Sequence, residues 1–270
     1  MCGICGIENK VREVEIFSDD DFDRIISGIL FGTITTAALD QETYLKIAHE
    51  FTKGIIEGYG KSFNGLEFDS KDYQMLFDLR ENAYVFSGAK TYQQTREISL
   101  KLREFLINKD GVSSLDEFKK QAKQILIDYN RNWLTTEYYS AIAQARSASQ
   151  WQQFESDKGL YPMLTYETVG DSRVRPTHAA LDGISRPIGD KFWSNYMPPN
   201  GWNCRCTVIQ GSDEVEKTNL QGFKQPNDVP DIFMMNAGKD RIVFSPKHPY
   251  FDVAPKDKAN AKNNWGLPMP

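Results

Sequence analysis

The nine-residue stretch PPNGWNCRC, residues 198–206, restricts the fold of this chain more than any other stretch. Its two prolines fix the backbone, and Gly201 follows closely, which is typical of a rigid turn. The turn delivers Cys204 and Cys206, one residue apart, in a chain that has only four cysteines. Three interpretations are open at this point: a pair of metal ligands, a nucleophile, or a well-packed corner.

The composition is that of a folded protein, since 40% of the 270 residues are hydrophobic and 12% are aromatic. This length predicts one large domain or two modest ones. The formal net charge of −5 predicts weak non-specific binding to DNA. No run of about 18 apolar residues is present, so we expect no membrane partner. The start of the chain lacks the pattern of a secretory signal, and we expect folding in a reducing cytoplasm.

Helical periodicity dominates the first half of the chain. Ser18 and the acidic residues after it predict a helix N-terminus. Apolar residues with i, i+3, i+4, i+7 spacing then predict a pair of helices over residues 20–58. Ser114 begins a capping box, with Glu117 three residues later, and an apolar face follows it. We expect further helices over residues 70–86, 90–108 and 135–154.

The pattern changes near residue 157. Alternating side chains over residues 164–169 predict a strand, and Thr207–Ile209 predicts a second short strand. We therefore predict an α+β protein with a largely helical N-terminal region and a small α+β C-terminal domain. The predicted boundaries are 1–156 for the helical region, 157–252 for the C-terminal module and 253–270 for a loose tail.

The first six residues, MCGICG, suggest a catalytic cysteine. A cysteine after the initiator methionine resembles the start of class II glutamine amidotransferases. That resemblance ends there, because an acidic, helix-patterned stretch follows where those enzymes have a β-rich domain. Cys2 and Cys5 also have the spacing of half a zinc site, but no second such pair and no nearby histidine support it. We assign these thiols no role.

Residues 171–183 read DSRVRPTHAALDG, and Phe192, Trp193 and then PPNGWNCRC follow. This arrangement resembles the head morphogenesis family of tailed bacteriophages, the Mu F-like minor head proteins. Flanking residues also resemble that family, including Thr136–Tyr138 and His248–Phe251, so the resemblance covers roughly residues 85–252.

The resemblance implies a minor capsid protein of a phage or prophage. Such a protein is made in the cytoplasm of the bacterial host and resides in the virion, inside the capsid near the portal. Its implied role is in head assembly and in DNA packaging or delivery, without enzymatic activity. The implied partners are the portal protein, major capsid or scaffold proteins, and packaged DNA. Residues 1–156 would then be the assembly region.

Zinc binding is one hypothesis for the unusual C-terminal residues. If residues 204–206 are extended, Cys204 and Cys206 face the same side and could reach one ion together with His178. The resemblance implies a metal knuckle of the form C-x-x-C…H-x-x-C. This sequence departs from it, because Arg175 and Gly201 stand where two of those ligands would be.

A structural polar cluster is the favoured alternative, in which arginines pair with aspartates beside a histidine, under a tryptophan cover. A third hypothesis is a catalytic pair of His178 with Cys204 or Asp171. The protein would then be a metal- or cysteine-dependent nuclease or hydrolase acting on DNA. A toxin-like effector carried in the head is a further class. The predicted members of the polar cluster are Asp171, Arg173, Arg175, His178, Asp182, Trp193, Trp202 and Arg205.

Overall fold

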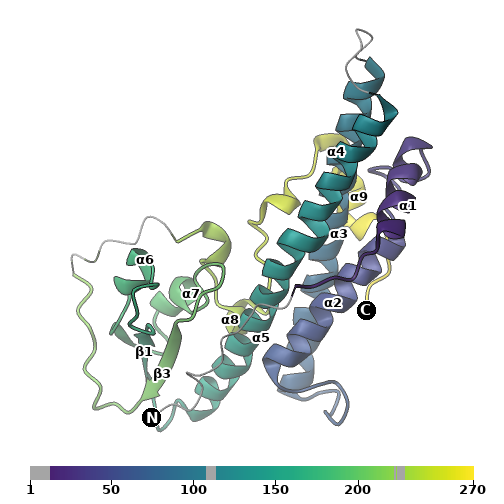
Figure 1. Ribbon diagram of the computed structural model, residues 1–270. Coiled ribbons are helices and arrows are strands. Elements are labelled where there is room, and N and C mark those ends of the chain that lie inside the picture. Colours follow the sequence, from purple (N-terminus) through teal and green to yellow (C-terminus); the bar gives the residue numbers. More distant parts are fainter. Residues whose placement is uncertain (1–12, 108–113, 222, 224–228) are drawn as a thin grey trace.

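The protein consists of a helical body joined to a small three-stranded sheet, as the computed structural model shows (Figure 1). The structure describes residues 13–107, 114–221, 223 and 229–270. The hypotheses about Cys2 and Cys5 concern residues outside these ranges. The expected fold class, a helical region with a small α+β domain, is confirmed.

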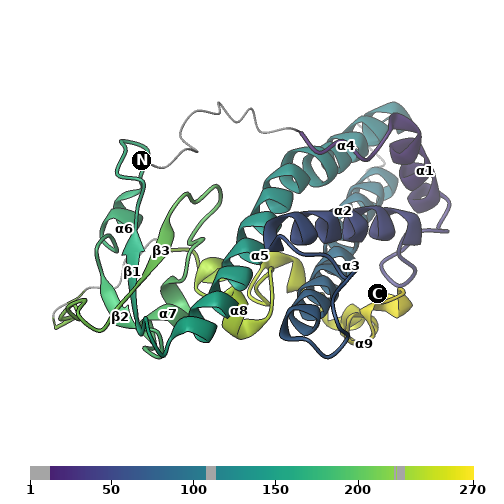
Figure 2. The ribbon, with the colours of Figure 1, turned by 90° about the horizontal axis from the view of Figure 1, so that it is seen from below.

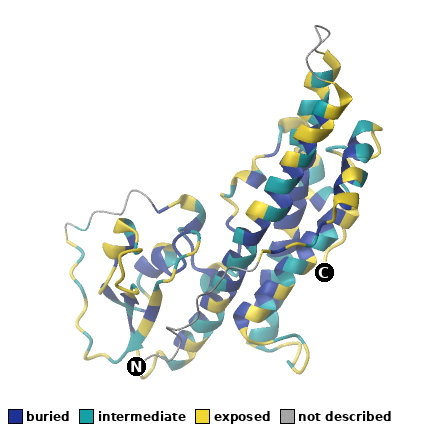
Figure 3. Cartoon of the chain, in the orientation of Figure 1, coloured by how far each residue is buried: buried dark blue, intermediate teal, exposed yellow. Residues whose placement is uncertain are grey.

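Six consecutive helical segments form most of the body. Their buried residues lie on the sides where the helices face one another (Figure 3). The segments are α1 (Asp19–Leu30), α2 (Gln41–Tyr59), α3 (Lys71–Ile107), α4 (Leu115–Ile127), the π-helix η1 (Asp128–Trp133) and α5 (Leu134–Asp157).

The helix starts follow the local signals in the sequence. The Ser18 side chain accepts a hydrogen bond from the amide of Asp21, and the Asp21 carboxylate accepts one from the amide of Ser18. The Ser114 side chain likewise accepts from the amide of Glu117. Both predicted N-termini are therefore confirmed, and each cap satisfies an amide that the helix itself leaves unpaired.

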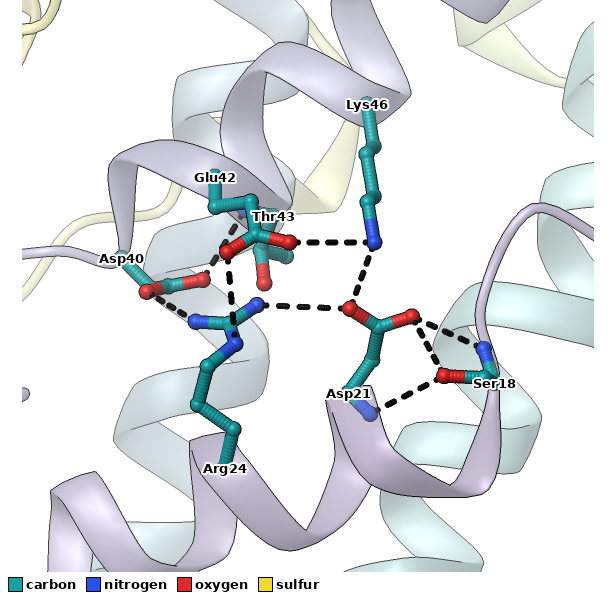
Figure 4. Close-up of polar contacts among 7 residues, drawn as sticks. All are labelled: Ser18, Asp21, Arg24, Asp40, Glu42, Thr43 and Lys46. Atoms are coloured by element: carbon teal, nitrogen blue, oxygen red, sulfur yellow. Dashed lines mark hydrogen bonds and ion pairs between the residues drawn. The ribbon is translucent and has the colours of Figure 1, made fainter.

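The Asp21 carboxylate also joins α1 to α2 (Figure 4). It lies 2.5 Å from Lys46 Nζ and 3.6 Å from Arg24, which in turn pairs with Asp40 at 2.6 Å. Burial alone would raise the pKa of Asp21, but hydrogen bonds from Lys46 and Ser18 lower it to about 2. The charged carboxylate therefore favours the folded state once the pH is above the ordinary aspartate range.

One long helix, α3, replaces the two helices predicted over residues 70–86 and 90–108. The prediction of two separate helices was wrong, because α3 is continuous and Gly88 lies in its interior. A Cβ atom at Gly88 would overlap the side chain of Asn264, from the last residues of the chain. This glycine allows a close approach between distant segments.

Helices α2 and α5 cross where two glycines of α2 face α5. A Cβ atom at Gly58 would overlap the carbonyl oxygen of Ile142, and one at Gly54 would lie 3.0 Å from the ring of Tyr138. The GIIEG sequence of residues 54–58 thus brings the two backbones unusually close.

A buried ion pair links α3 to α5 inside the body. Lys90 is 0% exposed and Glu137 is 2% exposed, and their charged atoms are 2.7 Å apart. The hydroxyl of Tyr250 donates to the other oxygen of Glu137 at 2.7 Å. The ammonium also lies over the rings of Tyr129 and Tyr250. Three segments far apart in the sequence therefore meet at one pair of charges.

The sheet is antiparallel and has the order β2-β1-β3. Thr165 of the central strand lies opposite Ser185 on one side and Ile209 on the other. Leu164 and Tyr166 point into a small core with residues of the short helix α7. The strands are β1 (Met163–Glu167), β2 (Ser185–Pro187) and β3 (Thr207–Gly211), and the helices between them are α6 (Pro176–Ala179) and α7 (Phe192–Tyr196).

Helix α5 belongs to both parts of the molecule. Ala141 and Ala145 pack in the helical core, whereas Trp151 and Phe154, further along the same helix, pack in the core beside the sheet. The side chain of Gln150 donates a hydrogen bond to the carbonyl of Val208 in β3, at 3.1 Å. Figure 2 shows α5 and the short helix α8 between the sheet on one side and helices α2 and α3 on the other.

The segment after the sheet returns to the helical body. Phe244 stacks on Phe86 of α3 with ring centroids 3.8 Å apart, and Asn82 bonds to the backbone of residues 243 and 244. The boundary predicted for the C-terminal module, residues 157–252, therefore does not match the packing of the chain. Residues 237–251 pack in the core of the helical body and not in the core beside the sheet. This segment contains η2 (Asp231–Phe233), α8 (Ala237–Asp240) and η3 (Pro249–Phe251).

The prediction of a loose tail over residues 253–270 was wrong. The hydroxyl of Tyr44 donates to the carbonyl of Pro268 at 2.6 Å, and Asn264 donates to that hydroxyl. Trp265 stacks on Tyr92 with centroids 5.1 Å apart. The polar composition hid these long-range contacts. The tail contains η4 (Pro255–Asp257), α9 (Lys258–Lys262) and η5 (Asn264–Gly266).

Within the ranges that the structure describes, no helix combines the length and the apolar character needed to cross a lipid bilayer.

Candidate metal centre

The PPNGWNCRC stretch forms a tight turn against the sheet. Its peptide bond between Pro198 and Pro199 is cis, and Asn203 has a positive φ of 56°. Asn200 is fully buried, and its side-chain oxygen accepts a hydrogen bond from the Tyr166 hydroxyl of β1 at 3.1 Å. The side-chain amide of Asn200 donates to the carbonyl of Met197. This asparagine therefore fixes the turn that leads to the two cysteines.

His178 reaches the same turn from the short helix α6. Pro176 occupies the first turn of that helix, where its missing amide leaves no unmet donor. The imidazole is 3% exposed, and its Nε2 atom lies 3.3 Å from the carbonyl oxygen of Asn200. A carbonyl only accepts, so Nε2 donates this hydrogen bond.

The second ring nitrogen of His178, Nδ1, faces both thiols. It lies 3.4 Å from Cys206 Sγ and 3.6 Å from Cys204 Sγ, and the three donor atoms lie within 4.8 Å of one another. Two ligands of a tetrahedral zinc ion, one nitrogen and one sulfur, are about 3.5 Å apart. The spacing therefore fits one ion, with the Nε2 hydrogen bond to Asn200 as the outer contact that orients the ring.

The two thiols shift each other's pKa in opposite directions. The Cys206 thiol donates to Cys204 and lowers the pKa of Cys204, with a further contribution from His178. The same pairing raises the pKa of Cys206, since two adjacent thiolates would repel each other. The lowered pKa of Cys204 favours metal binding, because metals bind the thiolate form.

Arginines lie at the rim of this cluster. Arg205 makes two hydrogen bonds of 2.7 Å to the Asp171 carboxylate, and they lower the pKa of Asp171. The backbone amide of Arg173 adds a third bond to the same carboxylate. Arg175 instead donates to the carbonyl of Trp202 at 2.7 Å. Its guanidinium lies close to Gly201, so the two positions at which the chain departs from the implied knuckle are neighbours.

The structure brings together only part of the predicted polar cluster. Asp182 accepts a hydrogen bond from the backbone amide of Thr168, and no arginine among the described residues pairs with it. Trp193 is buried in the core beside the sheet and donates to the carbonyl of Arg186. Trp202 meets Phe233 and His248 edge to face. Trp193 and Trp202 therefore do not cover one arginine cluster together, as expected, but pack in two different places.

Two residues of the site were not singled out in the sequence. Asn200 orients the turn and, through its carbonyl, the imidazole, and Tyr166 holds Asn200 to the sheet. The signal for Asn200 was its place between two prolines and a glycine, because asparagine side chains commonly bond to the backbone in such turns. Tyr166 gave no signal beyond the alternation of its strand.

The fold and the site together describe a helical protein with a small antiparallel module built around a histidine and two cysteines. Comparison with known proteins agrees with the resemblance in the sequence. A family model described as "Phage Mu protein F like protein" matches residues 108–209, from the end of α3 to β3 and including His178 and both cysteines. These residues form a Mu F-like segment, and the resemblance to that phage head morphogenesis family is confirmed.

Two curated relatives carry related names. The "Putative capsid assembly protein F" of Escherichia phage Mu is 33% identical over 124 residues, which is 46% of this chain and 28% of the relative. The "Mu-like prophage FluMu F protein" of Haemophilus influenzae is 37% identical over 78 residues, 29% of this chain and 18% of the relative. The alignments thus span less than a third of either relative. No solved structure matches the chain.

Proposed function

We propose that this chain is a structural component of a tailed-phage or prophage head, acting in head morphogenesis beside the portal. The observation that carries the proposal is the Mu F-like segment over residues 108–209, which contains most of the sheet, the His178 cluster and helix α5. The name of the phage Mu relative, a capsid assembly protein, supports the same role. The partners we propose are the portal protein, capsid or scaffold proteins, and packaged DNA.

The chemistry of the cluster supports a structural role better than an enzymatic one. His178 and Cys204 have the residue types of a nucleophilic pair, and Nδ1 faces both sulfurs while a backbone carbonyl holds Nε2. The lack of room for a substrate is what favours the structural role. The hollow over these residues is very small, at about 20 Å³. A substrate would need a larger opening beside the reacting atoms.

The head-protein proposal is tested by locating the chain in purified particles. Induced phage particles are separated into heads and tails, and the chain is quantified in each by mass spectrometry against the portal protein. We expect it in the head fraction, at a constant low ratio to portal, and in portal complexes isolated from disrupted heads. Absence from both heads and precursor heads would overturn the proposal. Cleavage of DNA by the purified protein would favour the nuclease alternative.

We also propose that His178, Cys204 and Cys206 hold a zinc ion, with a water or another small ligand in the fourth position. Zinc would cross-link α6 to the turn before β3 and so stabilise the module without taking part in a reaction. Three protein ligands are fewer than a closed structural zinc site usually has, which predicts a more easily extracted ion.

Metal analysis of the reduced, purified chain tests the zinc proposal. We expect about one zinc per chain, a loss of zinc in His178→Ala and Cys206→Ser, and a lower melting temperature after treatment with a chelator. The matched control for Cys206→Ser is Cys2→Ser, which also removes one thiol and should keep the ion. A zinc content well below one per chain in the reduced wild type would remove the proposal, and it would leave the head role untouched.

A further inference from the structure

The last turns of α3 present an apolar stripe that no described part of the chain covers. Leu100 is 47% exposed and Ile107 is 63% exposed, and the two are seven residues apart, so they lie on the same face of the helix. Together with Arg103 and Glu104 they line a shallow groove of about 340 Å³. We call these four residues the α3 stripe.

The α3 stripe faces away from the helical core. On the opposite side of the same turns, Ile98 is buried, and Leu102 and Phe105 pack against the core. Phe105 stacks on Phe118 of α4 with centroids 6.0 Å apart. The α3–α4 contact therefore uses one side of α3 and leaves the stripe free. Figure 1 shows that these turns lie at the end of the helical body, far from the sheet, and Figure 3 shows many exposed residues there.

The charges beside the stripe indicate what covers it. Arg103 and Glu104 flank the Leu100–Ile107 line on opposite sides, because consecutive helix positions are about 100° apart. Glu104 is bonded to Lys101 of its own helix at 2.9 Å in an exposed pair. Among the residues that the structure describes, Arg103 has no ion-pair partner. The stripe is thus apolar in the middle, positive on one side and negative on the other.

Such a stripe complements a second copy of itself in one orientation only. If two copies of α3 pair in parallel about a two-fold axis, Leu100 meets Leu100 and Ile107 meets Ile107. Each Arg103 then lies opposite Glu104 of the other copy. In an antiparallel pair, Arg103 would face Arg103 and Glu104 would face Glu104, which is repulsive. We infer that the α3 stripe is a self-association surface, which pairs two copies of this chain with their α3 helices parallel.

The test is the oligomeric state of the full chain, measured by sedimentation velocity over a range of protein concentrations. We expect a monomer–dimer equilibrium that Leu100→Ser with Ile107→Ser abolishes, since both side chains are exposed and the fold does not need them. Arg103→Glu and Glu104→Arg should each weaken dimerisation about ten-fold, because each creates two like-charge contacts.

The double variant Arg103→Glu, Glu104→Arg distinguishes the parallel pair, because it exchanges the two sides and should restore wild-type association. Lys119→Glu, an exposed charge change of the same size on α4, is the control and should leave association unchanged. Circular dichroism checks that every variant is folded. A wild type that stays monomeric overturns the inference, as does association that ignores the single charge changes. Failure of the double variant to recover overturns the parallel arrangement of the two α3 helices.

Discussion

Replacement of Lys90 by methionine is expected to destabilise the protein by about 3–5 kcal/mol. Lys90 is fully buried, and its ammonium lies 2.7 Å from the Glu137 carboxylate, which is itself almost fully buried. Methionine fills a similar volume but leaves the carboxylate with only the Tyr250 hydroxyl as its partner. An unpaired charge inside the helical core costs far more than the pair contributes. Urea denaturation followed by circular dichroism measures the loss.

The double variant Lys90→Met, Glu137→Gln is the control for this interpretation. Glutamine keeps an oxygen that can accept from Tyr250 and carries no charge, so most of the lost stability should return. Should the double variant be as unstable as Lys90→Met alone, the loss comes from packing rather than from the stranded carboxylate, and the electrostatic explanation fails.

Alanine at Gly58 is expected to lower the free energy of unfolding by about 1–3 kcal/mol. The sign is informative, because glycine to alanine in a helix interior ordinarily stabilises by about 1 kcal/mol. Here the added methyl group would overlap the carbonyl oxygen of Ile142, so α2 and α5 must move apart. The same urea denaturation measures the change.

Gly54→Ala is the matched control, one turn earlier in α2. Its methyl group would meet the ring of Tyr138 at 3.0 Å, and an aromatic ring can rotate away where a backbone carbonyl cannot. We expect this variant to lie near the wild type. Equal losses for both variants would show that the crossing does not depend on the backbone contact at Gly58.

The helices were predictable because their signals are local. The Ser18 and Ser114 caps are read from a few neighbouring residues, and both are present. Nothing in the sequence explained Gly88 inside one long helix, because the reason for this glycine is a contact with Asn264, far along the chain. The tail was misjudged for the same reason, since Pro268 and Trp265 are held by distant residues, Tyr44 and Tyr92 respectively.

The candidate site was predictable in part. The spacing of Cys204 and Cys206 and the unusual density around His178 pointed to residues that do converge. The spacing gave no way to assign tryptophans or acids to the cluster, because several of each type lie nearby in the sequence. Trp193 and Asp182 each have a partner that only the three-dimensional path of the chain determines, Arg186 and Thr168 respectively.

Helix α5 has a practical consequence for anyone who wishes to study the sheet in isolation. A fragment starting at residue 157 would lack Trp151 and Phe154, which form part of the hydrophobic core beside the sheet. It would also lose Gln150, whose side chain donates a hydrogen bond to the carbonyl of Val208 in the edge strand β3. Exposed aromatic surface and an open strand border favour aggregation. Any trimmed version should therefore begin before Leu134 and keep the whole of this helix.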